Sequence, residues 1–141
     1  MDLNLKPGMC LTNQELMDMF GVANSGGMRR SLKNDVLLLI HNTINSIYED
    51  RWKNGVLYYT GMGLIGNQDI NFSQNKTLAN AHINGIQVLL FEMNKKNRYE
   101  YVAEVELIDE PFYESQRDDK NNVRQVIIFC LLYTSDAADE R

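Results

Sequence analysis

The chain has 141 residues, of which 44% are hydrophobic and 23% charged, and its formal net charge is −5 at pH 7. This length and composition predict one globular domain with a core of its own and exclude a disordered chain. The acidic balance excludes a polyanion partner attracted by overall charge alone. Binding to DNA would therefore depend on a local basic surface.

The cysteines and the chain ends indicate a compartment. Cys10 and Cys130 have no metal-ligand spacing, and we expect both to be reduced thiols. The N-terminal residues lack the apolar segment of a signal peptide, and no apolar run is long enough to span a bilayer. We therefore expect a soluble, cytoplasmic protein without membrane contact.

The first half of the chain predicts one helix and at least two strands. Thr12 followed by Glu15 forms a capping-box pattern, and Gly21 ends the helix that begins there. Residues 21–31 are predicted to form a flexible loop. The continuous apolar runs predict strands at 35–41 and 56–60.

The second half continues with short elements. Residues 73–84 predict a polar helix, and 114–122 a surface loop. The expected strands are 86–92, 98–108 and 123–132, and in the second of these Tyr99, Tyr101, Ala103, Val105 and Leu107 share one face. The fold class predicted is mainly β (α+β), as a closed or nearly closed, twisted antiparallel β-barrel with two or three short helices.

Residues 133–141 do not fit this pattern. Their sequence is typical of a translated sequencing adapter. We therefore expect a domain of residues 1–132, a non-native tail at 133–141, and a natural protein that continues beyond Leu132.

Common catalytic motifs are missing from the sequence. Gly61, Gly63 and Gly66 match the Gly-x-Gly-x-x-Gly spacing, but no β-α-β unit surrounds them, so a dinucleotide site is not predicted. We interpret His41 and His82 as structural residues. We expect no catalytic residue, no metal site and no cofactor in this chain.

Aromatic residues concentrate around an acid between residues 48 and 63. One interpretation places them in the core of a β-strand, with Asp50 as a turn acid. The other is a base pocket, in which aromatic faces stack on a flipped base and a carboxylate accepts a hydrogen bond from the exocyclic amine of cytosine. The candidate base-pocket residues are Tyr48, Asp50, Trp52, Tyr58, Tyr59, Thr60 and Gly61.

The segment 24–30 also allows two interpretations. It is either a solvated connector or a loop whose backbone and arginines reach a phosphate or a groove. The candidates for contact with the DNA backbone or a groove are Ser25, Gly26, Gly27, Arg29, Arg30, Arg51 and Lys76.

The pattern Tyr48-x-Asp50-x-Trp52-x-x-Gly55-Val56-x-Tyr58-Tyr59-Thr60-Gly61-x-Gly63 resembles the SRA-like (SET and RING finger-associated) domain of McrA-type, modification-dependent HNH restriction endonucleases. The similarity extends over residues 5–132. It implies an SRA/PUA-like fold that binds double-stranded DNA and flips a modified cytosine, with a 5-methyl or hydroxymethyl group. It also implies roles in the site: Asp50 holds the cytosine edge, Tyr48 and Tyr59 stack on the ring, and Thr60 and Gly61 line the pocket.

The resemblance has one departure, because no His-Asn-His pattern of an HNH nuclease is present. It therefore implies a reader domain that targets a nuclease encoded beyond this chain. The alternative is a small β-barrel that binds a protein or a small molecule and uses the aromatics as core. A concave pocket rimmed by lysine and arginine favours the reader, and fully packed rings under an acidic face favour the alternative.

Overall fold

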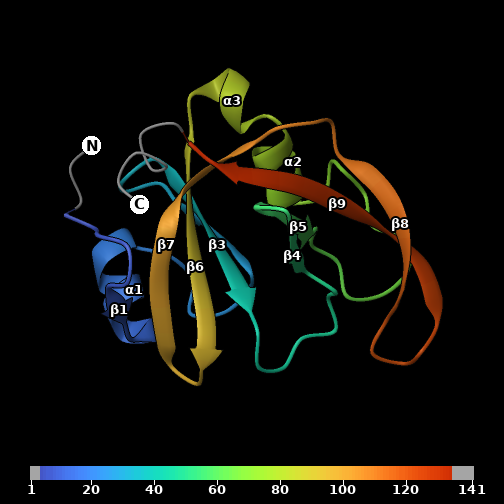
Figure 1. Ribbon diagram of the computed structural model, residues 1–141, viewed down its shortest axis with the longest axis horizontal. Helices are drawn as coiled ribbons and strands as arrows, with labels where there is room; N and C mark the ends of the chain where they lie inside the picture. Colours follow the sequence, from blue (N-terminus) through green and yellow to red (C-terminus); the bar gives the residue numbers. More distant parts are fainter. Residues whose placement is uncertain (1–3, 135–141) are drawn as a thin grey trace.

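The computed structural model describes residues 4–134, in which strands predominate (Figure 1). The strands are β1 (Cys10–Leu11), β2 (Met28–Ser31), β3 (Val36–Asn42), β4 (Arg51–Lys53), β5 (Val56–Thr60), β6 (Gln87–Lys95), β7 (Arg98–Leu107), β8 (Phe112–Arg117) and β9 (Val123–Tyr133). The helices are α1 (Asn13–Phe20), α2 (Gln74–Ala79) and α3 (Ala81–Asn84). The predicted mainly-β class with a few short helices is confirmed.

All described strands belong to one sheet of order β2-β3-β6-β7-β9-β5-β4, with β1 paired to β7 and β8 to β9. Two features differ from the predicted antiparallel barrel. First, β3 and β6 run parallel, and the segment between them, which holds two strands and two helices, supplies the long crossover that parallel neighbours require. Second, the sheet is not closed, because β2 and β4 stand at opposite ends of the strand order.

Strand β3 lies between two core layers. Its residues Leu37 and Leu39 belong to one buried cluster, and Leu38 to the other. The second cluster also contains Leu16 and Phe20 of α1. Burial of both faces explains why β3 is a continuous apolar run, as the sequence predicts. In Figure 1, α1 and β1 lie at one end of the molecule and the β8–β9 hairpin extends at the other.

Local signals in the sequence produce the predicted start and end of α1. Thr12 N donates to Glu15 Oε1 at 2.8 Å, and Glu15 N donates to Thr12 Oγ1 at 3.1 Å, which completes the capping box. Gly21 ends the helix in the left-handed conformation.

The predicted helix 73–84 is instead two helices, interrupted at Asn80. The side chain of Asn80 donates to Lys76 O at 2.9 Å and competes with the backbone for that carbonyl.

Two predicted loops contain strands. Residues 28–31 form β2 and residues 112–117 form β8, and each of these strands has one partner only. Strands paired on one side tolerate charged residues, which is why these segments read as loops in the sequence.

The predicted single apolar face of residues 99–107 is also corrected. The pairing of β6 with β7 shifts register between Leu90 and Phe91. Tyr99 and Tyr101 consequently belong to the α1-side cluster, while Ala103 and Val105 belong to the other.

The predicted non-native tail falls mostly outside the described residues, from 135 onward. Tyr133 is the last residue of β9, and its ring centroid lies 5.7 Å from that of Trp52. Within residues 4–134, no helix combines the length and the apolar character needed to cross a membrane.

Candidate functional site

A cavity of about 400 Å³ lies beside the ends of β3 and β5, a size typical of small-ligand sites. It joins two groups of predicted residues that are distant in the sequence: Tyr48, Asp50 and Tyr59 from the candidate base pocket, and Ser25, Gly26, Gly27 and Arg29 from the candidate DNA-contact segment. We call it the Asp50 cavity.

Asp50 is largely buried in the wall of this cavity. Its Oδ1 accepts a hydrogen bond of 2.8 Å from the backbone N–H of Thr60. Burial raises the pKa of Asp50 above its ordinary value, and the Thr60 N–H and the nearby His41 act in the opposite direction. The site therefore holds a carboxylate at a fixed position on a mostly desolvated wall.

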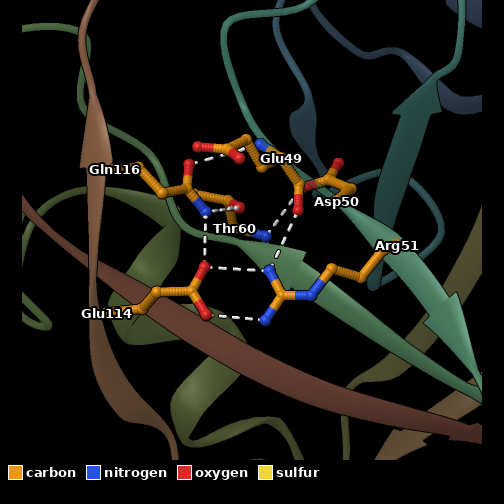
Figure 2. A network of polar contacts seen from close by, with 6 residues as sticks. All are labelled: Glu49, Asp50, Arg51, Thr60, Glu114 and Gln116. Atoms are coloured by element: carbon orange, nitrogen blue, oxygen red, sulfur yellow. Dashed lines mark hydrogen bonds and ion pairs between the residues drawn. The ribbon is translucent and has the colours of Figure 1, made fainter.

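A network of side chains from β8 holds the segment that carries Asp50, as Figure 2 shows. Gln116 Oε1 accepts from Glu49 N at 3.2 Å, and Gln116 Nε2 donates to Thr60 Oγ1 at 3.2 Å. The same Nε2 donates to Glu114 Oε2 at 2.9 Å. Gln116 is buried, and it contacts the backbone of Glu49, which precedes Asp50, and the side chain of Thr60. Through these contacts β8 holds the Asp50 segment against β5.

Arg51, a candidate for contact with the DNA backbone, is partly exposed and forms an ion pair within the protein. Its guanidinium donates to both oxygens of Glu114, at 2.8 and 2.6 Å, and lies 5.2 Å from the centre of the Tyr58 ring. The pairing with Arg51 lowers the pKa of Glu114. Such a two-pronged pair is geometrically specific, so Arg51 serves to anchor β4 to β8.

The two tyrosines at the cavity differ in exposure. Tyr48 is half-buried, its hydroxyl lies 3.5 Å from Gly63 O, and burial raises its pKa. Tyr59 is only 3% exposed, and its hydroxyl lies 2.9 Å from Gly27 O and 3.0 Å from Ile40 O. Tyr59 is thus a core residue that also forms part of the cavity wall, and Tyr48 is the more accessible ring.

Trp52 and Tyr58, two of the candidate base-pocket residues, do not line the Asp50 cavity. Successive side chains of a strand point to opposite faces, so Tyr58 is directed away from Tyr59 and packs against Phe112, 6.4 Å between ring centres. Trp52 donates its indole N–H to Glu92 Oε2 at 3.0 Å and lines a separate cavity.

The two arginines of the candidate DNA-contact segment lie in β2 and bind within the protein. Arg29 is 5% exposed; it donates to Gly26 O at 2.9 Å and to Asn13 Oδ1 at 2.6 Å, and its guanidinium lies over the Tyr99 ring. Arg30 pairs with Asp35 at 2.6 Å. Lys76 is exposed on α2. The two arginines therefore stabilise the segment around them, and Arg29 also lines the Asp50 cavity.

We expect Arg29→Met to unfold at a lower temperature than the wild type. The substitution leaves Gly26 O and Asn13 Oδ1 without a donor, and losing a charged hydrogen-bond donor of this kind costs about 1–3 kcal/mol. Thermal unfolding measures the effect. Lys53→Met is the control for removing a positive charge, because Lys53 is exposed and its loss is expected to change stability little. Equal losses for both variants would contradict the buried role of Arg29.

The turn after β5 requires glycine and is held by the side-chain amides of Gln68 and Asn75, which no sequence motif indicated. A Cβ on Gly61 would lie 2.8 Å from Asn75 Oδ1 and 3.0 Å from Gln68 Oε1. Gln68 Nε2 donates to Gly61 O at 2.7 Å, and Asn75 Oδ1 accepts from Met62 N at 2.6 Å. Thr60 and Gly61 themselves are buried and support the cavity from behind.

Two further residues at the rim were missed. Leu64, which lines the cavity, and its neighbour Ile65 are 60% and 69% exposed. Two exposed aliphatic residues between Gly63 and Gly66 are the signal that could have selected them.

The charges around the site fit the predicted basic rim only in part. The cavity lining contains the cation Arg29 and the anion Asp50, and no lysine among the described residues.

Within residues 4–134, no group of three or more His, Cys, Asp or Glu side chains is arranged to hold a metal ion. His41 Nδ1 instead lies 2.8 Å from Glu92 Oε2.

Comparisons with known proteins bear on this geometry. The family described as "ScoMcrA-like, SRA domain" matches residues 7–140. A comparison with curated proteins finds no match.

Several solved structures share the fold. A structure of the sulfur binding domain and SRA domain of ScoMcrA with phosphorothioated DNA matches with a TM-score of 0.75 and 12% identity, over 96% of this chain and 44% of that chain. The SRA domain of SUVH5 with hemimethylated CG DNA matches with a TM-score of 0.67 and 19% identity, over 93% and 90%. The modification-dependent restriction endonuclease AspBHI matches with a TM-score of 0.62 and 16% identity, over 87% and 38%. This chain therefore spans less than half of the ScoMcrA and AspBHI chains that it matches.

Proposed function

The chain belongs to the ScoMcrA-like SRA domain family, and on this premise we propose that it reads a modified cytosine in double-stranded DNA by accepting the flipped base in the Asp50 cavity. The observation that carries the proposal is the carboxylate of Asp50, fixed by the Thr60 N–H on the wall of a cavity that Tyr48 also lines.

The chemistry of the site suits cytosine. A carboxylate accepts a hydrogen bond from the exocyclic amine of cytosine, whereas thymine presents a carbonyl oxygen at that position. The half-buried ring of Tyr48 offers a face on which a base can stack. Tyr59 contributes its edge to the wall without moving, because both of its hydroxyl contacts fix it to the core.

The rim of the cavity suits a kinked duplex. The exposed pair Leu64 and Ile65 provides an apolar wedge beside the opening, and side chains of this type insert between bases where the stack is interrupted. On the other side, residues Ser25–Gly27 offer backbone groups with little side-chain bulk. With Arg29, Arg30 and Arg51 engaged within the protein, contacts with phosphates fall to such backbone groups and to exposed lysines such as Lys76.

The similar structures support the choice of ligand class. They include an SRA domain crystallised with hemimethylated CG DNA and a ScoMcrA fragment with phosphorothioated DNA. We propose a 5-methyl or hydroxymethyl group as the modification. We further propose that the domain targets an HNH nuclease in a longer cytoplasmic protein, since this chain spans less than half of the ScoMcrA fragment that it matches.

A binding screen tests the proposal. Duplexes that differ only at one central position carry cytosine, 5-methylcytosine or 5-hydroxymethylcytosine, and a fourth carries unmodified bases with one phosphorothioate linkage. Fluorescence polarisation measures the dissociation constant of each, and 2-aminopurine beside the central base reports unstacking. We expect tighter binding and higher 2-aminopurine fluorescence with a modified cytosine. Equal affinity for all four duplexes contradicts a reader function and favours a protein or small-molecule ligand, and preference for the fourth assigns the site to the DNA backbone.

A further inference from the structure

Arg124 of β9 is a buried cation with unused hydrogen-bonding capacity. It is 3% exposed, and its Nη1 donates to the carbonyl oxygens of Gly63 and Gly66, the latter at 3.2 Å. Its Nε and Nη2 are buried without a hydrogen-bond partner, and no other buried side-chain nitrogen or oxygen atom of residues 4–134 shares this condition. Buried donors are normally satisfied, so these two call for an explanation.

The electrostatic environment makes the arrangement more unusual. No carboxylate of the described residues forms an ion pair with Arg124, although its charge contributes to a lowered pKa of Asp118. A buried charge without a paired opposite charge is costly. The two unused nitrogens lie on one edge of the planar guanidinium, the edge with which arginine grips an oxygen acceptor with two parallel N–H groups.

The nearest group that belongs to the reading site is Tyr48. Its hydroxyl lies 3.5 Å from Gly63 O, the same carbonyl that Arg124 holds, and this distance is at the upper limit of a hydrogen bond. Arg124 opposes the effect of burial on the pKa of Tyr48, both through its positive charge and through a side-chain hydrogen-bonding interaction, so the two groups already lie within reach of one another. Tyr48 lies in a segment without regular structure, between β3 and β4, whereas Arg124 is fixed in the sheet.

We propose that Arg124 is a positioning residue for Tyr48: when a base enters the Asp50 cavity, the Tyr48 hydroxyl leaves its weak contact with Gly63 and strengthens its contact with the Nε and Nη2 edge of Arg124. This movement fixes the tyrosine ring against the base. The inference rests on the proposed function, because the base supplies the contact that shifts Tyr48.

A double-mutant cycle with Tyr48→Phe and Arg124→Met tests the coupling. Each single substitution is expected to lower the preference for modified over unmodified duplex about tenfold, equivalent to ~1.4 kcal/mol, and the double substitution no further. Arg124→Lys retains one cationic nitrogen for the Gly63 carbonyl but has no two-nitrogen edge, so it is expected to lose the preference as Arg124→Met does. If Arg124 only stabilised the Gly63 turn, Arg124→Lys would instead keep the preference for the modified duplex.

Measurements of melting temperature and a control variant distinguish a positioning role of Arg124 from a role in folding. Arg124→Met removes the donor to Gly66 O and one donor to Gly63 O, so its melting temperature is expected to fall; the preference is therefore compared at a temperature at which wild type and variant are both folded, and it is expected to be lower in the variant. Arg117→Met removes an exposed charge from the neighbouring strand β8 and is expected to leave the preference unchanged.

A measurement without DNA tests the contact by itself. NMR of tyrosine labelled with ¹³C at Cζ follows the ionisation of Tyr48, and Arg124→Met is expected to raise its pKa because a nearby positive charge is lost. Additive effects in the cycle, or an unchanged pKa of Tyr48 in Arg124→Met, would overturn the proposal. Equal affinity of the wild-type protein for all duplexes would contradict the reader function instead. The binding screen with the wild-type protein gives this result before any variant is measured, so the two failures are distinguishable.

Discussion

Asp50→Asn is expected to lower the preference for a modified-cytosine duplex over its thymine counterpart by about ten- to a hundredfold. The asparagine retains an oxygen for the Thr60 N–H, but its second position is an amide NH₂, which meets the cytosine amine as donor against donor. One base-edge contact of this kind contributes about 1–3 kcal/mol of discrimination. Fluorescence polarisation with the two duplexes measures the ratio.

The stability of Asp50→Asn is expected to differ from that of the wild type in its dependence on pH. Because burial raises the pKa of Asp50 in the folded state, its ionisation opposes folding: the contribution of Asp50 to stability is fully present below its ordinary pKa and is lost as the pH rises through the raised one. Asp50→Asn removes this loss, so its melting temperature above that range is expected to equal or exceed that of the wild type. The wild-type preference for modified cytosine should in turn weaken as the pH falls through the raised pKa of Asp50.

Glu49→Gln is the matched control for this charge. Glu49 is exposed, and it enters the network of Figure 2 through its backbone N and O atoms. Removing its carboxylate is expected to leave the preference intact. If both substitutions reduce the preference equally, a general effect of negative charge would replace the specific contact that we assign to Asp50.

Gly61→Ala is expected to destabilise the fold by about 2–4 kcal/mol, since it combines overpacking with disturbed buried hydrogen bonds. The added Cβ would lie 2.8 Å from Asn75 Oδ1 and 3.0 Å from Gln68 Oε1. Those oxygens accept from Met62 N at 2.6 Å and from Ile127 N at 2.9 Å, so neither amide moves without breaking a bond to the backbone. Denaturant unfolding measures the loss.

Gly55→Ala is the control for the effect of a methyl group as such. Gly55 has a φ of +81°, and a Cβ there meets no atom within 4 Å, so the cost is backbone strain of about 1–2 kcal/mol. A loss at Gly61 no larger than that at Gly55 would contradict the view that the turn is shaped by close contact with the two amides.

Several parts of this protein could be predicted from local sequence because short-range physics determines them. The capping box of α1 needs only Thr12, Glu15 and the intervening backbone. The apolar run of β3 reports burial on both faces. The acid and the tyrosine that meet at the cavity, Asp50 and Tyr48, stand two residues apart and were recognised by their chemical types.

The three-dimensional arrangement of the site was decided by pairings that local sequence does not contain. Strand alternation turned Tyr58 away from Tyr59, and the pairing of β2 with β3 buried Arg29. The crossover between β3 and β6 made these neighbours parallel, and the sheet stays open because β2 and β4 stand at opposite ends of the strand order.

The sequence by itself therefore determined the mainly-β class, the main strands and the residue types of the candidate site. Only the tertiary structure decided which of those residues meet and what holds them: Gln116 against Glu49 and Thr60, Gln68 and Asn75 around Gly61, and Arg124 against Gly63. The physical reason is that a buried polar group must find its partner wherever the fold brings one, and the partners here come from β8, β9, α2 and the segment before α2.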